Sequence, residues 1–305
     1  QDSLATGVKL QGYAVQCQTE KRNRKVNEVL RRVVEVLAKQ GIGSLLLKGQ
    51  GLANLYEQPL HRQPGDIDLY VGAARYAEAK KVLSEQGWLS GEGVHEDVKH
   101  LGFSVDGVAV ELHYSAAILP GRRANMRFQE LTSQALTLMS DGFFMDESGD
   151  MDALRGVFVG VLPLQLNVVY TFIHLYRHFI DEGVSLRQLM DWSLLVRKLK
   201  PSDFGEVEKL LREFGFLKPW QVFGCLLVNE LGLKAEEVPC YDARYEKKAA
   251  RVLEMMFDES NHQSSVTGHA DTLGEKLRVL GDMARNFGRV FWLFPKDYVA
   301  FTWLL

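Results

Sequence analysis

The chain has 305 residues, of which 46% are hydrophobic and 25% are charged, so it can bury a sizeable core and has the composition of a soluble globular protein. Its formal net charge of -3 argues against nucleic acid as the main partner. The three cysteines are too far apart for a disulfide framework or a zinc knuckle, which fits a reducing compartment. The first residues lack the pattern of a signal peptide, and no apolar run reaches the roughly 18–20 residues of a membrane span. We therefore expect a soluble cytoplasmic protein that does not enter a membrane.

Residues 1–162 combine helical and strand patterns. Apolar residues recur at helical spacing in two segments, and alternation or short apolar runs predict four strands. Asp106-Gly107 is a strong hairpin signal between the last two strands. The predicted helices cover 20–40, 52–56 and 73–86, the strands cover 44–47, 66–71, 100–105 and 108–114, residues 126–139 are weakly helical or irregular, and 143–145 and 156–162 are short extended segments.

From Pro163 onward the pattern is helical. Ser202 is our candidate N-cap for the third of these helices, and a polar loop is expected at 261–272. We predict an α+β fold with a mixed α/β domain over residues 1–162 and an all-helical domain over 163–305. The predicted helices of the second domain cover 164–179, 186–199, 203–214, 220–231, 243–257 and 273–292.

The strand predicted at 66–71 carries two carboxylates. Side chains of a strand alternate between faces, so Asp66 and Asp68 share one face, while Ile67, Leu69 and Val71 share the core face. Neighbouring like charges repel, so without metal we expect at least one carboxyl group among Asp66, Asp68 and Glu111 of the strand at 108–114 to be harder to ionise than in the unfolded chain. A divalent metal is the simplest candidate for a cation that relieves this repulsion, because Mg²⁺ takes one or two carboxylates together with substrate phosphates.

The strand predicted at 108–114 repeats this logic. Val110 and Leu112 face the core, and Glu111 lies on the opposite face. If the two strands are neighbours, Glu111 joins Asp66 and Asp68, and three converging carboxylates suit a two-metal site for phosphoryl or nucleotidyl transfer. Gly49, which follows the strand at 44–47, would let backbone N–H groups approach phosphates.

These residues resemble a known family. Lys48-Gly49, Leu52-Ala53, Tyr56, Pro59, Arg62, Gly65-Asp66-Ile67-Asp68-Leu69 and Val110-Glu111-Leu112-His113 are similar to the nucleotidyltransferases of the DNA polymerase β superfamily. The nearest likeness is to a bacterial branch known only as an uncharacterised nucleotidyltransferase family. That branch also carries a helical second half like His174-Leu175, His178, Gly183 and Leu186-Arg187-Gln188.

The resemblance implies a polymerase β-like mixed sheet and the transfer of a nucleoside monophosphate from an NTP to an acceptor hydroxyl or phosphate. It implies a two-ion Mg²⁺ or Mn²⁺ site, with Asp66 and Asp68 binding both ions and Glu111 completing the one on the acceptor side. Gly49 and its neighbour Gln50 would hold the nucleotide phosphates.

The chain departs from the superfamily pattern around the phosphates. The usual Gly-Ser or Gly-Gly pair is Gly49-Gln50 here, and the interval to Asp66 is longer than usual. Lys48 and Arg62 are candidates for the missing positive charge, although Lys48 also suits the end of a strand. Arg187 in the helical half is a further candidate nucleotide contact.

The histidines have plainer interpretations. We interpret His113 as structural, His95 and His100 as surface residues, and the pair His174 and His178 as a polar seam, because no glutamate between them completes a metalloprotease motif.

Two other classes of function stay open beside the enzyme: a catalytically silent nucleotide-binding or regulatory module, and a toxin–antitoxin-type interaction subunit. The third carboxylate, Glu111, favours the enzyme. The acceptor is not indicated by the sequence.

Overall fold

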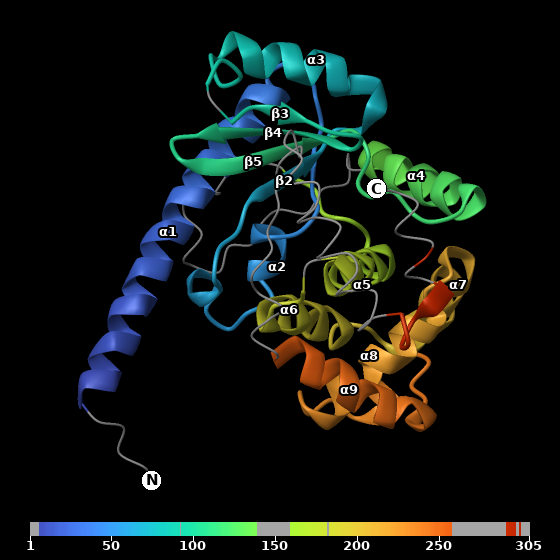
Figure 1. Ribbon diagram of the computed structural model, residues 1–305. Helices are drawn as coiled ribbons and strands as arrows, with labels where there is room; N and C mark the ends of the chain where they lie inside the picture. The colour runs from blue at the N-terminus through green and yellow to red at the C-terminus, as the bar shows by residue number, and fades with distance from the viewer. Residues whose placement is uncertain are drawn as a thin grey trace, which may run out of the picture. The chain divides into compact units, whose positions relative to one another are not determined.

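The computed structural model describes residues 6–91, 93–138, 159–181, 183–257, 291–296 and 299 (Figure 1). The chain divides into two compact units. The first comprises Gln1–Ala117 and Gln129–Pro163, and the second comprises Ile118–Phe128 and Leu164–Leu305. The first unit contains the sheet, and the second is helical.

The sheet of the first unit has five strands in the order β1-β2-β5-β4-β3. β2 and β5 are parallel, and the other neighbours are antiparallel, so the sheet is mixed and the predicted α+β class is confirmed. The two strands predicted on either side of Asp106-Gly107 form a hairpin, with both turn residues at positive φ as a two-residue turn of type I′ requires. The strands are β1 (Leu45–Leu46), β2 (Ile67–Tyr70), β3 (His95–Glu96), β4 (His100–Val105) and β5 (Val108–His113).

The register of β2 and β5 decides which side chains share a face. Ile67 pairs with Val110, and Leu69 pairs with Leu112. All four are buried in one apolar core with residues of α1 and α3, as the alternation of each strand predicts. The residues between them therefore face the other side of the sheet.

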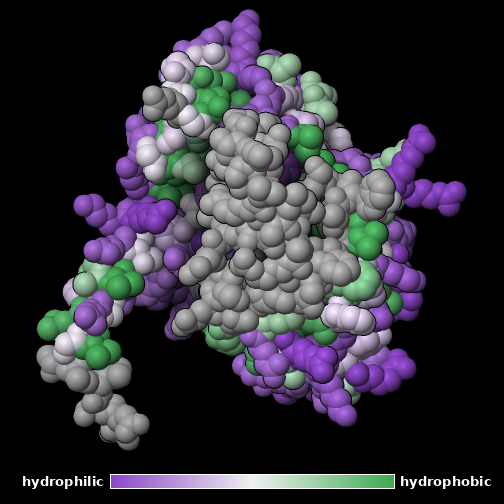
Figure 2. Space-filling view, in the orientation of Figure 1, coloured by the Kyte–Doolittle hydropathy of each residue, from purple (hydrophilic) through white to green (hydrophobic). Residues whose placement is uncertain are grey.

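Three helices of the first unit precede the hairpin: α1 (Thr6–Ala38), α2 (Gln50–Ala53) and α3 (Gly72–Glu85), with a 3-10 turn η1 (Pro59–His61). α1 begins fourteen residues before the position that we predicted. Our prediction depended on the pattern of buried residues, and burial starts only near residue 20. The first turns of α1 are exposed and carry apolar side chains such as Leu10 and Val15. Figure 2 shows green hydrophobic residues among purple ones along this end of α1, at the lower left.

Residues 126–139, which we expected to be weakly helical or irregular, lie mostly in a regular helix, α4 (Arg122–Thr137). The helices predicted after Pro163 are confirmed within the described residues. α7 begins with Asp203 at its N-cap, whereas our candidate cap, Ser202, lies inside the preceding 3-10 turn that Pro201 opens. These elements are α5 (Leu164–Asp181), α6 (Leu186–Val196), η4 (Pro201–Asp203), α7 (Phe204–Phe214), α8 (Leu217–Asn229), η5 (Ala235–Glu237), η6 (Ala243–Tyr245) and α9 (Glu246–Phe257).

Aromatic side chains form the centre of the second unit. Phe172 contacts the rings of Trp192, Trp220 and Phe223 at centroid distances of 4.9, 5.2 and 5.7 Å. The predicted extended segment at 143–145, the loop at 261–272 and nearly all of the helix at 273–292 lie outside the described residues. In the part of the chain that the structure describes, no helix has the length and apolar character of a membrane span.

Candidate metal centre

Three carboxylates converge on the face of the sheet opposite the apolar core. Asp66 directly precedes β2, Asp68 lies within it, and Glu111 lies on β5 directly opposite Asp68. One oxygen atom from each side chain lies within 4.8 Å of the others. The structure thus brings together the three residues that the alternation of the two strands predicts.

Asp68 is the most deeply buried of the three. Its Oδ1 lies 3.1 Å from Lys48 Nζ and 3.2 Å from His113 Nε2. Its Oδ2 is buried, and no described residue forms a hydrogen bond with it. A buried carboxylate oxygen without a partner is costly, and two more carboxylates lie beside it, so the donor set fits a divalent cation with oxygen ligands such as Mg²⁺.

Glu111 is held in its ionised form. Burial alone would raise its pKa, but the hydrogen bond from His113 and the charges of Lys48, His113 and His100 outweigh this and lower the pKa to about 2. Glu111 is therefore not a carboxyl group that repulsion makes harder to ionise, because cationic side chains lie close to it.

His113 connects two of the carboxylates. Its Nε2 lies 3.1 Å from Glu111 Oε2 as well as 3.2 Å from Asp68 Oδ1. Burial lowers the pKa of His113, yet the hydrogen bonds to these two carboxylates outweigh burial and leave the pKa raised. His113 therefore holds the two carboxylates together and neutralises part of their charge.

His100 is buried, so our interpretation of it as a surface residue is wrong, whereas His95 is exposed as expected. Burial lowers the pKa of His100 despite the attraction of Glu111. The hairpin signal contained the missing information. A two-residue turn at Asp106-Gly107 pairs Val105 with Val108. Five residues further from the turn on each strand, His100 is therefore opposite His113.

The turn after β1 lies beside Asp66. Gly49 has φ of +61°, and a Cβ atom there would lie 3.1 Å from the backbone oxygen of Asp66. Glycine therefore permits both this backbone conformation and the close approach of the two chain segments. Its neighbour Gln50 is buried, and its side-chain amide donates hydrogen bonds to the Oδ1 atoms of Asn23 and Asn27 on α1.

Asn23 was not among our candidate residues, yet it connects three segments. Its Nδ2 donates to the backbone oxygens of Leu60 and Arg62 at 2.6 and 2.8 Å, while its Oδ1 accepts from Gln50. Arg62 is buried, and its guanidinium donates to the backbone oxygen of Gln63 at 3.3 Å. Arg187 belongs to the second unit, and its contact with a nucleotide stays a prediction.

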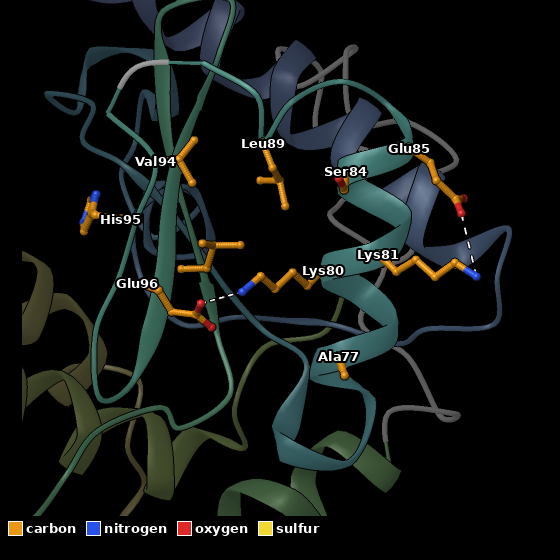
Figure 3. A pocket seen from close by; sticks show the side chains of 10 residues that line it. Ala77, Lys80, Lys81, Ser84, Glu85, Leu89, Val94, His95 and Glu96 are labelled. Atoms are coloured by element: carbon orange, nitrogen blue, oxygen red, sulfur yellow. Dashed lines mark hydrogen bonds and ion pairs between the residues drawn. The ribbon is translucent and has the colours of Figure 1, made fainter.

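An open groove of about 680 Å³ lies between α3 and the β3 edge of the sheet (Figure 3). Lys80 and Glu96 form an ion pair across it. Figure 3 shows Glu96 reaching toward α3, whereas the ring of the preceding residue, His95, points away from that helix. The side chains of β3 thus alternate as those of β2 do, and none of the three converging carboxylates lines this groove.

Comparison with curated proteins finds no match. The model of a protein family described as "uncharacterised nucleotidyltransferase" matches residues 9–232. The match includes the turn at Gly49, all three carboxylates and most of the described helical unit. The chain therefore belongs to this uncharacterised nucleotidyltransferase family.

Proposed function

We propose that this protein transfers a nucleoside monophosphate from an NTP to an acceptor hydroxyl or phosphate, with Mg²⁺ or Mn²⁺ held by Asp66, Asp68 and Glu111. The observation that supports the proposal best is the convergence of these three carboxylates, in which Asp68 lies directly opposite Glu111 and the Oδ2 of Asp68 has no hydrogen-bond partner among the described residues. Membership of a nucleotidyltransferase family gives the reaction class.

Each carboxylate has a distinct position in the proposed reaction. Bound divalent ions would supply a clamp on the attacking and leaving oxygens of an in-line displacement. Asp66, directly before β2, and Asp68, within β2, would hold both ions. Glu111 would hold the ion on the acceptor side, and its pKa of about 2 keeps it ionised and able to ligate at neutral pH.

Lys48 is the proposed link between metal binding and nucleotide binding. Its ammonium group lies 3.1 Å from Asp68 Oδ1 and 4.0 Å from the nearer oxygen of Asp66, so it partly neutralises the group. A cation that arrives at the carboxylates would compete with Lys48, and an NTP would bring phosphates with which the released ammonium can pair. Gly49 would contribute its backbone N–H, because glycine has no Cβ atom to block the approach of a phosphate.

The remaining candidates have different prospects. The Gln50 side chain is directed to α1, so we assign any phosphate contact of this residue to its backbone N–H. Arg62 and Arg187 stay candidate nucleotide contacts. If Arg187→Ala leaves nucleotide affinity and turnover unchanged, its assignment is wrong.

One observation favours the silent nucleotide-binding module as a second candidate. Lys48 and His113 already lie against the carboxylates of Asp68 and Glu111. A protein that binds no metal would require such side chains to offset the negative charge. Such a module would bind an NTP without releasing pyrophosphate, whereas the enzyme would release it in step with transfer.

The test is incubation with α-labelled ATP, CTP, GTP and UTP, Mg²⁺ or Mn²⁺, and a metabolite pool as the source of acceptor. We expect metal-dependent transfer of label with pyrophosphate release, and loss of most of this turnover in Asp68→Asn. Glu78→Gln on α3 is the matched control. The carboxylate of Glu78 is exposed and forms an ion pair with Arg75, away from the three converging carboxylates. No transfer from any of the four nucleotides, or equal turnover in Asp68→Asn, would contradict the proposal.

A further inference from the structure

A second group of metal-ligating side chains lies on the same face of the sheet. His100 on β4 and His113 on β5 are direct cross-strand partners, and their ring centroids are 4.9 Å apart. Glu111 lies two residues before His113 and shares its face. One ligand atom from each of these three residues lies within 4.8 Å of the others.

Both imidazoles direct the same ring nitrogen toward the carboxylate. His113 Nε2 lies 3.1 Å from Glu111 Oε2, and His100 Nε2 lies 3.6 Å from Glu111 Oε1. Both histidines are almost completely buried, at 2% and 5% exposure, so their rings are held by packing rather than free in solvent. Two fixed imidazoles and one carboxylate are a donor set that transition metals prefer over Mg²⁺.

A further carboxylate lies close to the ring of His100. Asp97 Oδ1 accepts hydrogen bonds from the backbone N–H groups of Lys99 and His100, each at 2.8 Å, which fixes its position. The same oxygen lies 3.3 Å from His100 Nδ1, the ring nitrogen that faces away from Glu111. That nitrogen forms no hydrogen bond with a described residue, so Asp97 lies near the ring without holding it.

The ring of His95 lies beside this group at the β3 edge. Gly102 on β4 pairs with Glu111 on one side and with His95 on the other. The exposed ring of His95 lies over Gly102, where an added Cβ would come within 2.2 Å of it. This ring points away from α3 in Figure 3, and its centroid lies 5.8 Å from that of His100.

We propose that His100, His113 and Glu111 bind a transition-metal dication of the Zn²⁺ or Co²⁺ class at a second site that shares Glu111 with the three-carboxylate group. Glu111 belongs to both groups, so an ion bound by the two histidines withdraws it from the other group. A second consequence rests on the proposed function. Transition metals bound at this site inhibit nucleotidyl transfer, because they compete with Mg²⁺ for Glu111.

Cobalt provides a test that needs no turnover. The full-length protein is titrated with Co²⁺, and the visible ligand-field absorption of the bound ion is recorded. We expect a saturable band that Zn²⁺ abolishes and that Mg²⁺ at the same concentration leaves in place, as the order of affinities for nitrogen ligands requires. His100→Ala should weaken Co²⁺ binding at least tenfold, because it removes one of the three proposed ligands.

One histidine variant serves as a control. His174→Ala breaks another close histidine pair, in which the Nε2 atoms of His174 and His178 are 3.1 Å apart. It should retain the parent affinity for Co²⁺. Circular dichroism checks the fold of His100→Ala, and His100→Asn replaces it if the alanine variant does not fold.

The outcomes separate this inference from the proposed function. Asp66→Asn lies outside the histidine group, so it should keep the cobalt band while it loses the response to Mg²⁺ and NTP. Absence of the band from the parent at millimolar Co²⁺, or an unchanged band in the folded His100 variant, would overturn the inference. So would loss of the band in His174→Ala. A failure of nucleotidyl transfer alone would leave the cobalt result intact.

Discussion

Replacing Glu111 with Gln should destabilise the metal-free protein at neutral pH, and by less as the pH falls. The carboxylate of Glu111 accepts a hydrogen bond from His113 and lies near Lys48 and His100. Gln keeps the shape and one acceptor oxygen but loses the charge. The change therefore isolates the electrostatic part of the interaction.

The magnitude follows from the pKa of Glu111, which is about 2 in the folded protein and 4.5 for an unperturbed glutamate. Each unit of pKa corresponds to about 1.4 kcal/mol, so the carboxylate contributes at most about 3 kcal/mol to the free energy of unfolding at pH 7. A depressed pKa gives stability that is fully present above pH 4.5 and is lost as the pH falls through about 2. At pH 3 the unfolded carboxyl is already mostly protonated, so only about 1 kcal/mol is left.

The assay is urea unfolding of the parent and of Glu111→Gln in EDTA at pH 7 and at pH 3, followed by circular dichroism. The difference in unfolding free energy should fall by more than half between the two pH values. Glu78→Gln, which removes an exposed carboxylate paired with Arg75, is the matched control and should cost about 0–1 kcal/mol. A Glu111→Gln variant as stable as the parent at pH 7, or a difference that does not depend on pH, would refute the reasoning.

Three further substitutions test the surroundings of the site. Lys48→Met removes the cation beside Asp68, so the metal-free protein should lose up to about 3 kcal/mol of stability while Mg²⁺ binds more tightly in calorimetric titration. Gly49→Ala requires alanine at φ of +61° and crowds the backbone of Asp66, so it should cost about 1–2 kcal/mol in urea unfolding and weaken the Mg²⁺ response. Asn23→Ala leaves two loop carbonyls without their hydrogen bonds and removes one of the two acceptors of the buried Gln50 amide, so it should lower the unfolding free energy by about 1–3 kcal/mol.

Each of these variants has a control in the chain. Lys39→Met removes an exposed lysine at the end of α1 and should change neither stability nor Mg²⁺ affinity. Gly41→Ala has a similar φ of +66° but meets nothing within 4 Å, so it should cost stability without weakening the Mg²⁺ response. Gln11→Ala, exposed on α1, should change the unfolding free energy by less than about 0.5 kcal/mol. Equal effects in a variant and its control would contradict the corresponding assignment.

The carboxylate group was predictable because it depends on local alternation. In β2 the apolar residues Ile67 and Leu69 fix which face is buried, and Asp68 must then lie on the other face. The same argument places Glu111. Only the parallel pairing of β2 with β5, which brings Asp68 opposite Glu111, had to be assumed.

The neighbours of the carboxylates were harder to predict because they come from other strands. Lys48 follows β1, and its ion pair with Asp68 depends on the antiparallel pairing of β1 with β2, for which the chain between them carries no hairpin signal. His100 was predictable in principle from the register of the hairpin. The start of α1 was not predictable in this way. Hydrophobic periodicity detects a buried helix face, and the first turns of α1 are exposed on all sides.

The most direct test of the central claim is the anomalous diffraction of crystals grown with Mn²⁺ and a non-hydrolysable NTP. We expect anomalous peaks at coordination distance from Asp66, Asp68 and Glu111, with Lys48 displaced from Asp68 toward the nucleotide phosphates. A bound nucleotide with no peak at the three carboxylates, and with Lys48 still paired to Asp68, would contradict it.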